Sequence, residues 1–219
     1  IINSPNNPCG SVIGREELEA LSVIAKENDI LVMSDEIYIR FLYEGSHESI
    51  SAYTGMLDRT IILDGFSKTY AMTGWRIGYG LFPSDLIEPI SRLVTNSVSC
   101  TASFTQQAAI EAITGPQNGS QEMVKEFKSR RDIIVSGLND INGISCATPK
   151  GAFYAFPNVE GTGLSSVEFA DRLLEEAGVA VLSGESFGKF GKGFIRISFA
   201  NSTANLEEAL QRIKKFIEQ

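Results

Sequence analysis

Short apolar segments that end in polar residues recur in the first half of the chain and constrain its fold. Residues 30–35, 60–64 and 77–82 each have this form, and we predict each of them as a buried strand. Residues 15–28 repeat apolar side chains every three or four positions, which predicts a helix. Alternating strands and helices are typical of an α/β fold, with a mainly parallel sheet between helices and ligands beyond the carboxyl ends of the strands.

The later part of the chain is predicted to be richer in helix. We expect helices at 86–96, 105–114, 121–139, 165–177 and 203–218, and strands at 151–156, 179–182 and 193–199. The helix at 121–139 is long enough to bridge two domains. We therefore predict that residues 1–120 are part of a large α/β domain and that residues 121–219 form a smaller α+β domain beginning with this helix.

The composition excludes several classes of function. The chain has 219 residues, 43% of them hydrophobic, and a net charge of −8, and it lacks the basic run that nucleic-acid binding requires. No apolar segment is long enough to span a membrane, and no secretory leader opens the sequence. We therefore expect neither a nucleic-acid nor a membrane partner, and a cytoplasmic location.

The cysteine and histidine content argues against metal and imidazole chemistry. Cys9, Cys100 and Cys146 are far apart and form no C-x-x-C pair, so neither a disulfide framework nor a zinc site is indicated. His47 is the only histidine, which excludes histidine-rich metal sites and the Ser-His-Asp and Cys-His catalytic classes within this chain. We expect no metal, and a base other than imidazole.

Lys68 and Arg76, eight positions apart, suit the capture of a phosphorylated aldehyde. The lysine amine can bond reversibly to an aldehyde, and the planar guanidinium can grip a phosphate through paired hydrogen bonds. This chemistry points to pyridoxal phosphate. Taken alone, Lys68 would most often be a solvated surface lysine, and Arg76 and Arg196 could each be structural ion-pair partners.

Asp35 closes a predicted strand, where a carboxylate needs a cationic or proton-donating partner. A pyridinium nitrogen is such a partner, and keeping it protonated makes the ring an electron sink. Tyr38 follows at the spacing of one helical turn and Asn7 lies in a turn-forming segment, so both could hydrogen-bond the ring oxygen. The structural alternative is that Asp35 caps a short helix and Tyr38 is a core aromatic.

Five motifs, in this order, resemble those of the class I/II pyridoxal-phosphate-dependent aminotransferases of fold type I. They are Asn-Asn-Pro-Cys-Gly at 6–10, Ser-Asp-Glu-Ile-Tyr at 34–38, Phe-Ser-Lys at 66–68 with Gly-Trp-Arg-Ile-Gly at 74–78, Gly-Ala-Phe-Tyr at 151–154 and Phe-Ile-Arg-Ile-Ser at 194–198. The resemblance covers nearly the whole chain and is closest to the aspartate aminotransferase-like subgroup of bacteria and archaea. It implies that residues 1–120 are the later part of the family's large cofactor-binding domain.

The resemblance implies a role toward pyridoxal 5'-phosphate for each matching residue. Lys68 is implied as the catalytic lysine that holds the cofactor covalently, and Asp35 as the partner of its pyridine nitrogen. Tyr38 is implied to bind the ring oxygen, and Arg76 together with Ser67 to bind the phosphate.

Asn7 and Arg196 are implied to face the substrate. Asn7 shares the ring oxygen with the tyrosine and, with Arg196, binds the substrate's α-carboxylate. The implied enzyme is a homodimeric aminotransferase that exchanges nitrogen between an L-amino acid and a 2-oxo acid, with 2-oxoglutarate as one partner, by a ping-pong mechanism. Two alternatives stay open: a β-eliminating lyase of the same fold, and a non-catalytic domain that senses the cofactor.

Two positions depart from the family pattern. Many relatives carry a phosphate-binding serine three residues before the lysine, where this chain has Gly65, so only Ser67 can supply a hydroxyl there. The loop at 183–188 has Ser183 where relatives usually have proline, which we expect to loosen the loop.

Several upstream elements of the family have no counterpart in this sequence, among them the glycine-containing phosphate loop and the aromatic residue that stacks on the cofactor. We therefore expect the chain to be the C-terminal portion of a longer protein. Part of the central sheet would then be missing and a strand edge exposed. We expect the isolated 219-residue fragment to be inactive or very weakly active.

Overall fold

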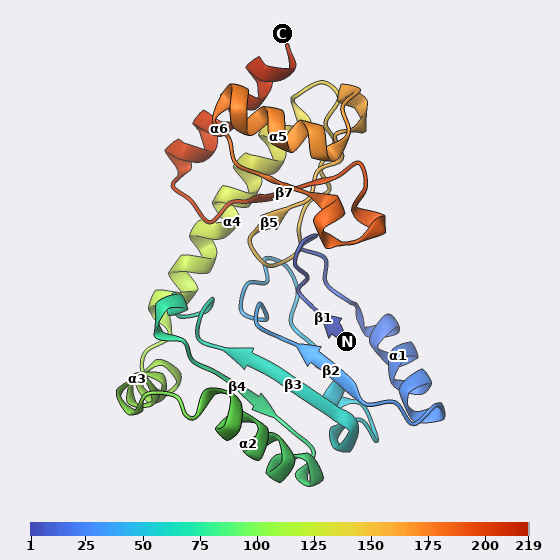
Figure 1. The fold of residues 1–219 in the computed structure, drawn as a ribbon, viewed down its shortest axis with the longest axis vertical. Coiled ribbons are helices and arrows are strands. Elements are labelled where there is room, and N and C mark those ends of the chain that lie inside the picture. Colours follow the sequence, from blue (N-terminus) through green and yellow to red (C-terminus); the bar gives the residue numbers. More distant parts are fainter. Residues whose placement is uncertain (219) are drawn as a thin grey trace. The chain divides into compact units, whose positions relative to one another are not determined.

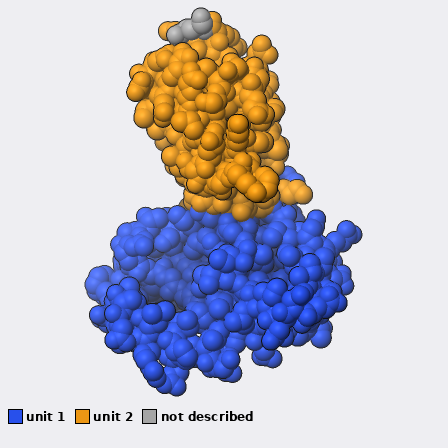
Figure 2. All heavy atoms as spheres, turned by 45° about the vertical axis from the view of Figure 1, so that its right-hand side comes forward, with its two compact units in different colours: residues 1–5, 12–122 blue, residues 6–11, 123–219 orange. Residues whose placement is uncertain are grey.

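The computed structural model describes residues 1–218, which form two sheets and six α-helices (Figure 1). The chain divides into two compact units (Figure 2). Unit 1 comprises residues 1–5 and 12–122, and unit 2 comprises residues 6–11 and the chain from 123 onward. The division falls inside the 22-residue helix α4 (Asn118–Asn139).

Unit 1 contains a four-stranded sheet in the order β1-β2-β3-β4. The strands are β1 (Ile2–Asn3), β2 (Val32–Asp35), β3 (Thr60–Gly65) and β4 (Gly78–Leu81). The first three are parallel, with Asn3 paired to Asp35 and Asp35 paired to Leu63, whereas β4 runs antiparallel to β3. The mainly parallel α/β sheet predicted from the sequence is thus confirmed.

Three helices accompany this sheet: α1 (Arg15–Glu27), α2 (Ser84–Val98) and α3 (Ser103–Thr114). Helix α1 buries Leu18 and Ala25 in a core cluster that also contains Val32 of β2. Acidic residues in its first turn and Lys26 in its last turn complement the helix dipole. This packing holds β2 in the sheet, so that its carboxyl end has a defined position.

Strand β4 and helix α2 are more exposed than their apolar sequences predict. Tyr79 and Leu81 are 41% and 57% exposed, so the expectation of a buried strand at 77–82 is wrong. No residue of α2 is buried, and its apolar side chains Ile87, Leu93 and Val98 are each more than half exposed. The reason is topological: within the described residues β4 is an outer strand with a neighbour on one side only.

Unit 2 contains an antiparallel sheet in the order β5-β7-β6, accompanied by α4, α5 (Ser166–Ala177) and α6 (Thr203–Ile217). Its strands are β5 (Tyr154–Ala155), β6 (Leu182–Ser183) and β7 (Ile195–Ser198). The core consists of side chains with essentially no exposed area, among them Ile134, Leu138, Phe169, Leu173, Ile195, Phe199 and Ile213. This is the α+β architecture that the sequence predicts.

All three strands predicted in unit 2 are shorter than expected; the one at 193–199 is limited to Ile195–Ser198. In the segment 151–156 only Tyr154 and Ala155 are in a strand, because Ala152 adopts a left-handed conformation with φ of 56° that breaks the extended chain. In the segment 179–182 only Leu182 is in a strand. Gly178 ends α5 with a positive φ, and the N–H of Val179 donates to the carbonyl of Leu173 to close the helix.

Gly10 anchors the turn that carries Asn7. Its φ is +66°, and its carbonyl oxygen accepts hydrogen bonds from the N–H groups of Lys150 (2.9 Å) and Gly151 (3.0 Å). A β-carbon at this position would lie 2.5 Å from Cβ of Pro149 and 2.8 Å from the carbonyl oxygen of Gly151. Both the backbone conformation and the space therefore require glycine.

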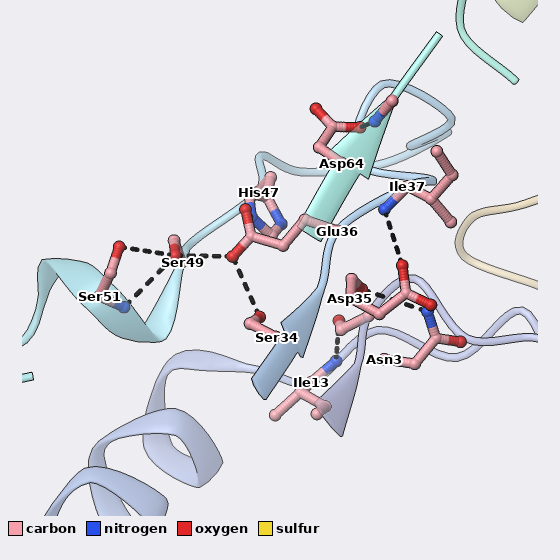
Figure 3. A network of polar contacts seen from close by, with 12 residues as sticks. Asn3, Ile13, Ser34, Asp35, Glu36, Ile37, His47, Ser49, Ser51 and Asp64 are labelled. Carbon is pink, nitrogen blue, oxygen red and sulfur yellow. Dashed lines mark hydrogen bonds and ion pairs between the residues drawn. The ribbon is translucent and has the colours of Figure 1, made fainter. Parts of the chain in front are cut away.

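A buried carboxylate follows β2. Glu36 is 4% exposed, and its side chain accepts hydrogen bonds from the hydroxyl groups of Ser34 (3.1 Å) and Ser49 (2.7 Å) and contacts Nε2 of His47 at 3.0 Å (Figure 3). Burial acts to raise the pKa of Glu36. The hydrogen bonds from His47 and Ser49, together with the charge of His47, outweigh burial and hold that pKa below its ordinary value. The ionised side chain thus ties the end of β2 to the loop at 47–49.

We expect Gly10→Ala to lower the free energy of unfolding by about 1–3 kcal/mol, because alanine is strained at this φ and collides with the facing backbone. Urea denaturation measures the change. Gly119→Ala in α4 is the control, since a β-carbon there meets nothing within 4 Å and alanine favours the helix. Equal stability of the two variants would contradict the role of Gly10.

We expect Glu36→Gln to lower the free energy of unfolding by about 1–3 kcal/mol at pH 7, since glutamine cannot accept the same charge-assisted bonds. A lowered folded-state pKa means that the stabilisation is fully present above the ordinary pKa of 4.5 and is lost as the pH falls through the folded value. The difference between variant and parent should therefore shrink at acidic pH in urea titrations. The exposed Glu207→Gln on α6 should show no such pH-dependent difference.

Candidate functional site

Two of the predicted site residues of unit 1, Asp35 and Lys68, arise from the carboxyl edge of the parallel strands. Asp35 is the last residue of β2, and Lys68 lies three residues beyond the end of the neighbouring β3. Adjacent parallel strands end at the same edge of a sheet, so the two side chains arise from the same edge. Both residues therefore lie where ligands bind in open α/β sheets, beyond the carboxyl ends of the strands.

Asp35 is half-buried and is held by its own turn. Its Oδ1 accepts the N–H of Ile37 at 3.2 Å, and its main-chain carbonyl accepts Nδ2 of Asn3 at 3.2 Å (Figure 3). Figure 3 shows the side chains of Asp35 and Glu36 directed to different sides of the chain. Tyr38 is 4% exposed and lies in the turn at 37–40. The burial of Tyr38 agrees with the alternative of a core aromatic, whereas Asp35 caps no helix, because the segment at 37–40 is a turn.

Lys68 is carried by a turn at 67–70 whose flanking residues are buried. Phe66 and Thr69 are each 3% exposed, whereas Ser67 and Lys68 are half-buried. The N–H of Tyr70 donates to the carbonyl of Phe66 at 3.2 Å and closes the turn. The buried neighbours restrain the backbone of the lysine while leaving its side chain accessible.

Arg76 adopts an unusual backbone conformation, with φ and ψ both 53°. Such left-handed geometry costs a non-glycine residue about 1–3 kcal/mol and recurs at functional sites. Its Nη1 donates to the carbonyl of Thr73 at 2.9 Å. Arg76 and Trp75 line a cavity of about 820 Å³ that also includes residues between Val98 and Thr105, whereas neither Asp35 nor Lys68 lines it.

Asp64 and Tyr79 form a pair that we did not predict from the sequence. The tyrosine hydroxyl donates to Oδ2 of Asp64 at 2.7 Å, and the N–H of Gly65 donates to Oδ1 at 2.6 Å. Burial raises the pKa of Asp64 and of Tyr79, and the nearby carboxylate raises the pKa of the phenol further. The antiparallel register of β3 and β4, which sets Asp64 opposite Tyr79, is the feature that could have revealed this pair. The pair fastens β3 to β4 ahead of the Lys68 turn.

Gly65 has a packing reason for lacking a side chain. It is paired with Gly78, and a β-carbon on Gly65 would lie 3.1 Å from Cα of Gly78 and 3.3 Å from the carbonyl oxygen of Ile77. The close approach of the two strands therefore disfavours serine at this position. Ser67, directly before the lysine, stays the hydroxyl residue predicted to bind the phosphate.

The predicted substrate-binding residues lie in unit 2. Nη1 of Arg196 on β7 donates to Oδ1 of Asn7 at 2.9 Å, although the two are 189 residues apart. The guanidinium carbon also lies 4.6 Å from the ring centroid of Tyr154 and 4.9 Å from that of Phe187. Sequence reasoning named Asn7 and Arg196 as substrate-binding residues and predicted neither aromatic contact.

Two further kinds of feature, a metal-binding cluster and a membrane-spanning helix, are not found among the described residues. Within residues 1–218, no three His, Cys, Asp or Glu side chains gather where they could hold a metal ion. None of the helices in this part of the chain is long and apolar enough to cross a bilayer.

Comparison with known proteins identifies the family. The model of the aminotransferase class I and II family matches residues 1–213. The chain is 44% identical to the aspartate aminotransferase of Pyrococcus abyssi and 41% identical to aromatic-amino-acid aminotransferase 2 of Thermococcus litoralis, in each case over 100% of the chain and 57% of the relative. A solved aromatic aminotransferase of Pyrococcus horikoshii superposes with a TM-score of 0.96 at 42% identity, covering 99% of this chain and 58% of that one.

The chain thus spans a little over half the length of the relatives it matches. That it is the later portion of a longer protein stays a prediction, as do the roles assigned to individual site residues. The fold, the ordered motifs and these matches together show that the chain belongs to the class I and II aminotransferases, a family whose cofactor is pyridoxal 5'-phosphate.

Proposed function

We propose that the protein containing these residues is an aminotransferase that moves the amino group of an L-amino acid to a 2-oxo acid, with 2-oxoglutarate as one partner and ping-pong kinetics. One observation carries the proposal: Asp35 and Lys68 stand at the same edge of two adjacent parallel strands in a chain of this family. A carboxylate and an amine so arranged can hold a small cationic ring and its aldehyde.

The residues fit pyridoxal 5'-phosphate group by group. The amine of Lys68 suits the aldehyde, the carboxylate of Asp35 suits the pyridinium nitrogen, and the phenol of Tyr38 suits the ring oxygen. Arg76 and Ser67 suit the phosphate, since a guanidinium can bind it through two parallel hydrogen bonds. When bound, the cofactor accepts the electron pair that the substrate's Cα–H bond leaves behind.

Lys68 acts as holder and then as base. Its Nζ would hold the cofactor through the aldehyde, and the same amine, when free, would take the proton from the substrate's Cα. The turn between buried Phe66 and Thr69 restrains the lysine for both tasks. No histidine is needed, which agrees with the engagement of the single histidine, His47, by Glu36.

Arg196 and Asn7 receive the substrate's α-carboxylate. The guanidinium offers several N–H donors in one plane, and a carboxylate can accept two of them. The hydrogen bond from Nη1 to Oδ1 of Asn7 orients both side chains.

We also propose a cytoplasmic homodimer. The resemblance to the family supports the dimer, and three cysteines without disulfide bonds in the described chain support a reducing compartment.

We expect Lys68→Ala, in the full-length protein, to slow the amino-acid half-reaction by at least about 100-fold, because the base is removed. The measurement is the rate at which an added amino acid bleaches the visible absorbance of the bound cofactor, and some noncovalent cofactor binding should survive. Lys215→Ala, on the exposed face of α6, is the matched control. Full-speed turnover by Lys68→Ala would remove this residue from the mechanism, and pyruvate and ammonia formed without a 2-oxo acid would indicate the lyase.

We expect the isolated 219-residue chain to show little or no transamination. Exposed apolar side chains on α2 and α3, such as Leu93, Val98 and Phe104, leave a surface that needs covering. Purified and mass-verified fragment can be assayed with aspartate and aromatic amino acids as donors. Activity comparable with that of the full-length protein would overturn this expectation.

A further inference from the structure

Arg196 is contacted by aromatic rings that reach it from both sides of its strand. Tyr154 belongs to β5 and Phe187 to the 3-10 helix Gly184–Phe187 that follows β6, and these two strands flank β7 in the sheet. Both ring centroids lie within 5 Å of the guanidinium carbon. At this distance the negative face of a ring attracts the cation.

Phe187 is 38% exposed, so burial alone does not fix the position of its ring. Aromatic neighbours supply the further contacts. Its ring meets Phe156 edge-on at 6.3 Å, and Phe156 stacks on Phe194 with centroids 5.2 Å apart and planes only 3° from parallel. Phe156 and Phe194 thus form a rigid aromatic support for Phe187. Packing against Phe156 favours an apolar side chain at this position, and the contact with Arg196 gives a specific reason for an aromatic ring.

The loop that carries Phe187 is closed by two glycines. A β-carbon on Gly184 would collide with the carbonyl of Gly191, and one on Gly191 would collide with the carbonyl of Gly184. The N–H of Gly184 also donates to the carbonyl of Phe194 at 2.7 Å. The two ends of the segment 184–191 therefore lie close together, so the loop between them has a defined shape.

A buried hydroxyl ties this loop to helix α5. Ser166 is 1% exposed; its hydroxyl donates to Oε1 of Glu185 at 3.1 Å and accepts from the hydroxyl of Ser183 at 3.2 Å. Ser183 also caps the loop by accepting the N–H of Glu185. Proline at position 183 would lack this hydroxyl, so the serine that we expected to loosen the loop supplies contacts that hold it.

We propose that Phe187 is a positioning residue for the carboxylate receptor: the tethered loop holds its ring on Arg196, so that the planar edge of the guanidinium is presented to the substrate's carboxylate. This inference rests on the proposed role of Arg196. The N–H donors of a guanidinium lie in its plane, so a ring stacked on it leaves these donors available while limiting rotation of the side chain. Loss of the ring costs carboxylate affinity, not proton transfer.

The test compares variants of the full-length, cofactor-loaded protein. Phe187→Leu removes the ring but keeps apolar bulk, and Phe187→Trp restores a ring. Phe190→Leu removes an aromatic residue that is 87% exposed in the same loop and serves as the control. For each, KM and kcat for the amino acid are measured together with competitive inhibition by propanoate and by its uncharged isostere propanamide.

We expect Phe187→Leu to raise KM and the propanoate inhibition constant by about 3- to 30-fold, the range of one cation–π contact, with kcat changed less than twofold. Propanamide inhibition should be unchanged, and Phe187→Trp should restore most of the affinity. Ser166→Ala should shift the same constants in the same direction by a smaller factor, and it decides the question if Phe187→Leu fails to fold. Phe190→Leu should match the parent.

The outcomes separate this inference from the proposed function. If Arg196→Leu leaves propanoate binding unchanged, Arg196 is not the carboxylate receptor and the proposed function loses that residue. If Arg196→Leu abolishes propanoate binding while Phe187→Leu behaves like Phe190→Leu, only the positioning role is overturned. Equal inhibition constants for Phe187→Leu and Phe187→Trp would also overturn it.

Discussion

The parallel pairing of β1, β2 and β3 is the constraint on which the candidate site depends. Because the three strands run in the same direction, Asn3, Asp35 and the segment leading to Lys68 all emerge at one edge. In open α/β sheets ligands bind beyond the carboxyl ends of the parallel strands, where side chains from neighbouring strands converge. Helix α1 keeps this register by packing Leu18 and Ala25 against β2.

Polar side chains at this edge are stabilised locally before any ligand binds. Glu36 is held by Ser34, Ser49 and His47, and Asp64 is held by Tyr79. A buried carboxylate without such partners would be costly, so these contacts allow several acids to stand near each other around β2 and β3. In unit 2 a charged side chain is likewise held by neighbouring groups: the rings of Tyr154 and Phe187 contact the guanidinium of Arg196.

The spacing of apolar residues predicted where helices and strands lie better than it predicted whether they are buried and what they contact. The six helices were expected within a few residues of their observed bounds because their apolar spacing is regular. The exposure of β4 was not expected, because an apolar segment does not reveal whether another strand or helix covers it. The strand expected at 179–182 began late, because the closing bond of α5 uses Val179. Three of the hydrogen-bond partners, His47 and Ser49 for Glu36 and Tyr79 for Asp64, lie 11 to 15 positions away, where no spacing rule applies.

Residue types and their order were enough to identify the α/β class, the family, and Lys68, Asp35, Arg76 and Arg196 as candidate residues, since the chemistry of an amine, a carboxylate and two guanidinium groups is carried by each side chain itself. The tertiary structure alone decided which groups meet. Asn7 and Arg196 are joined across 189 residues, and Phe187 reaches Arg196 through a loop tied to Ser166. Such contacts depend on strand order and on close backbone approach at glycines, which are properties of the folded chain and not of any local segment.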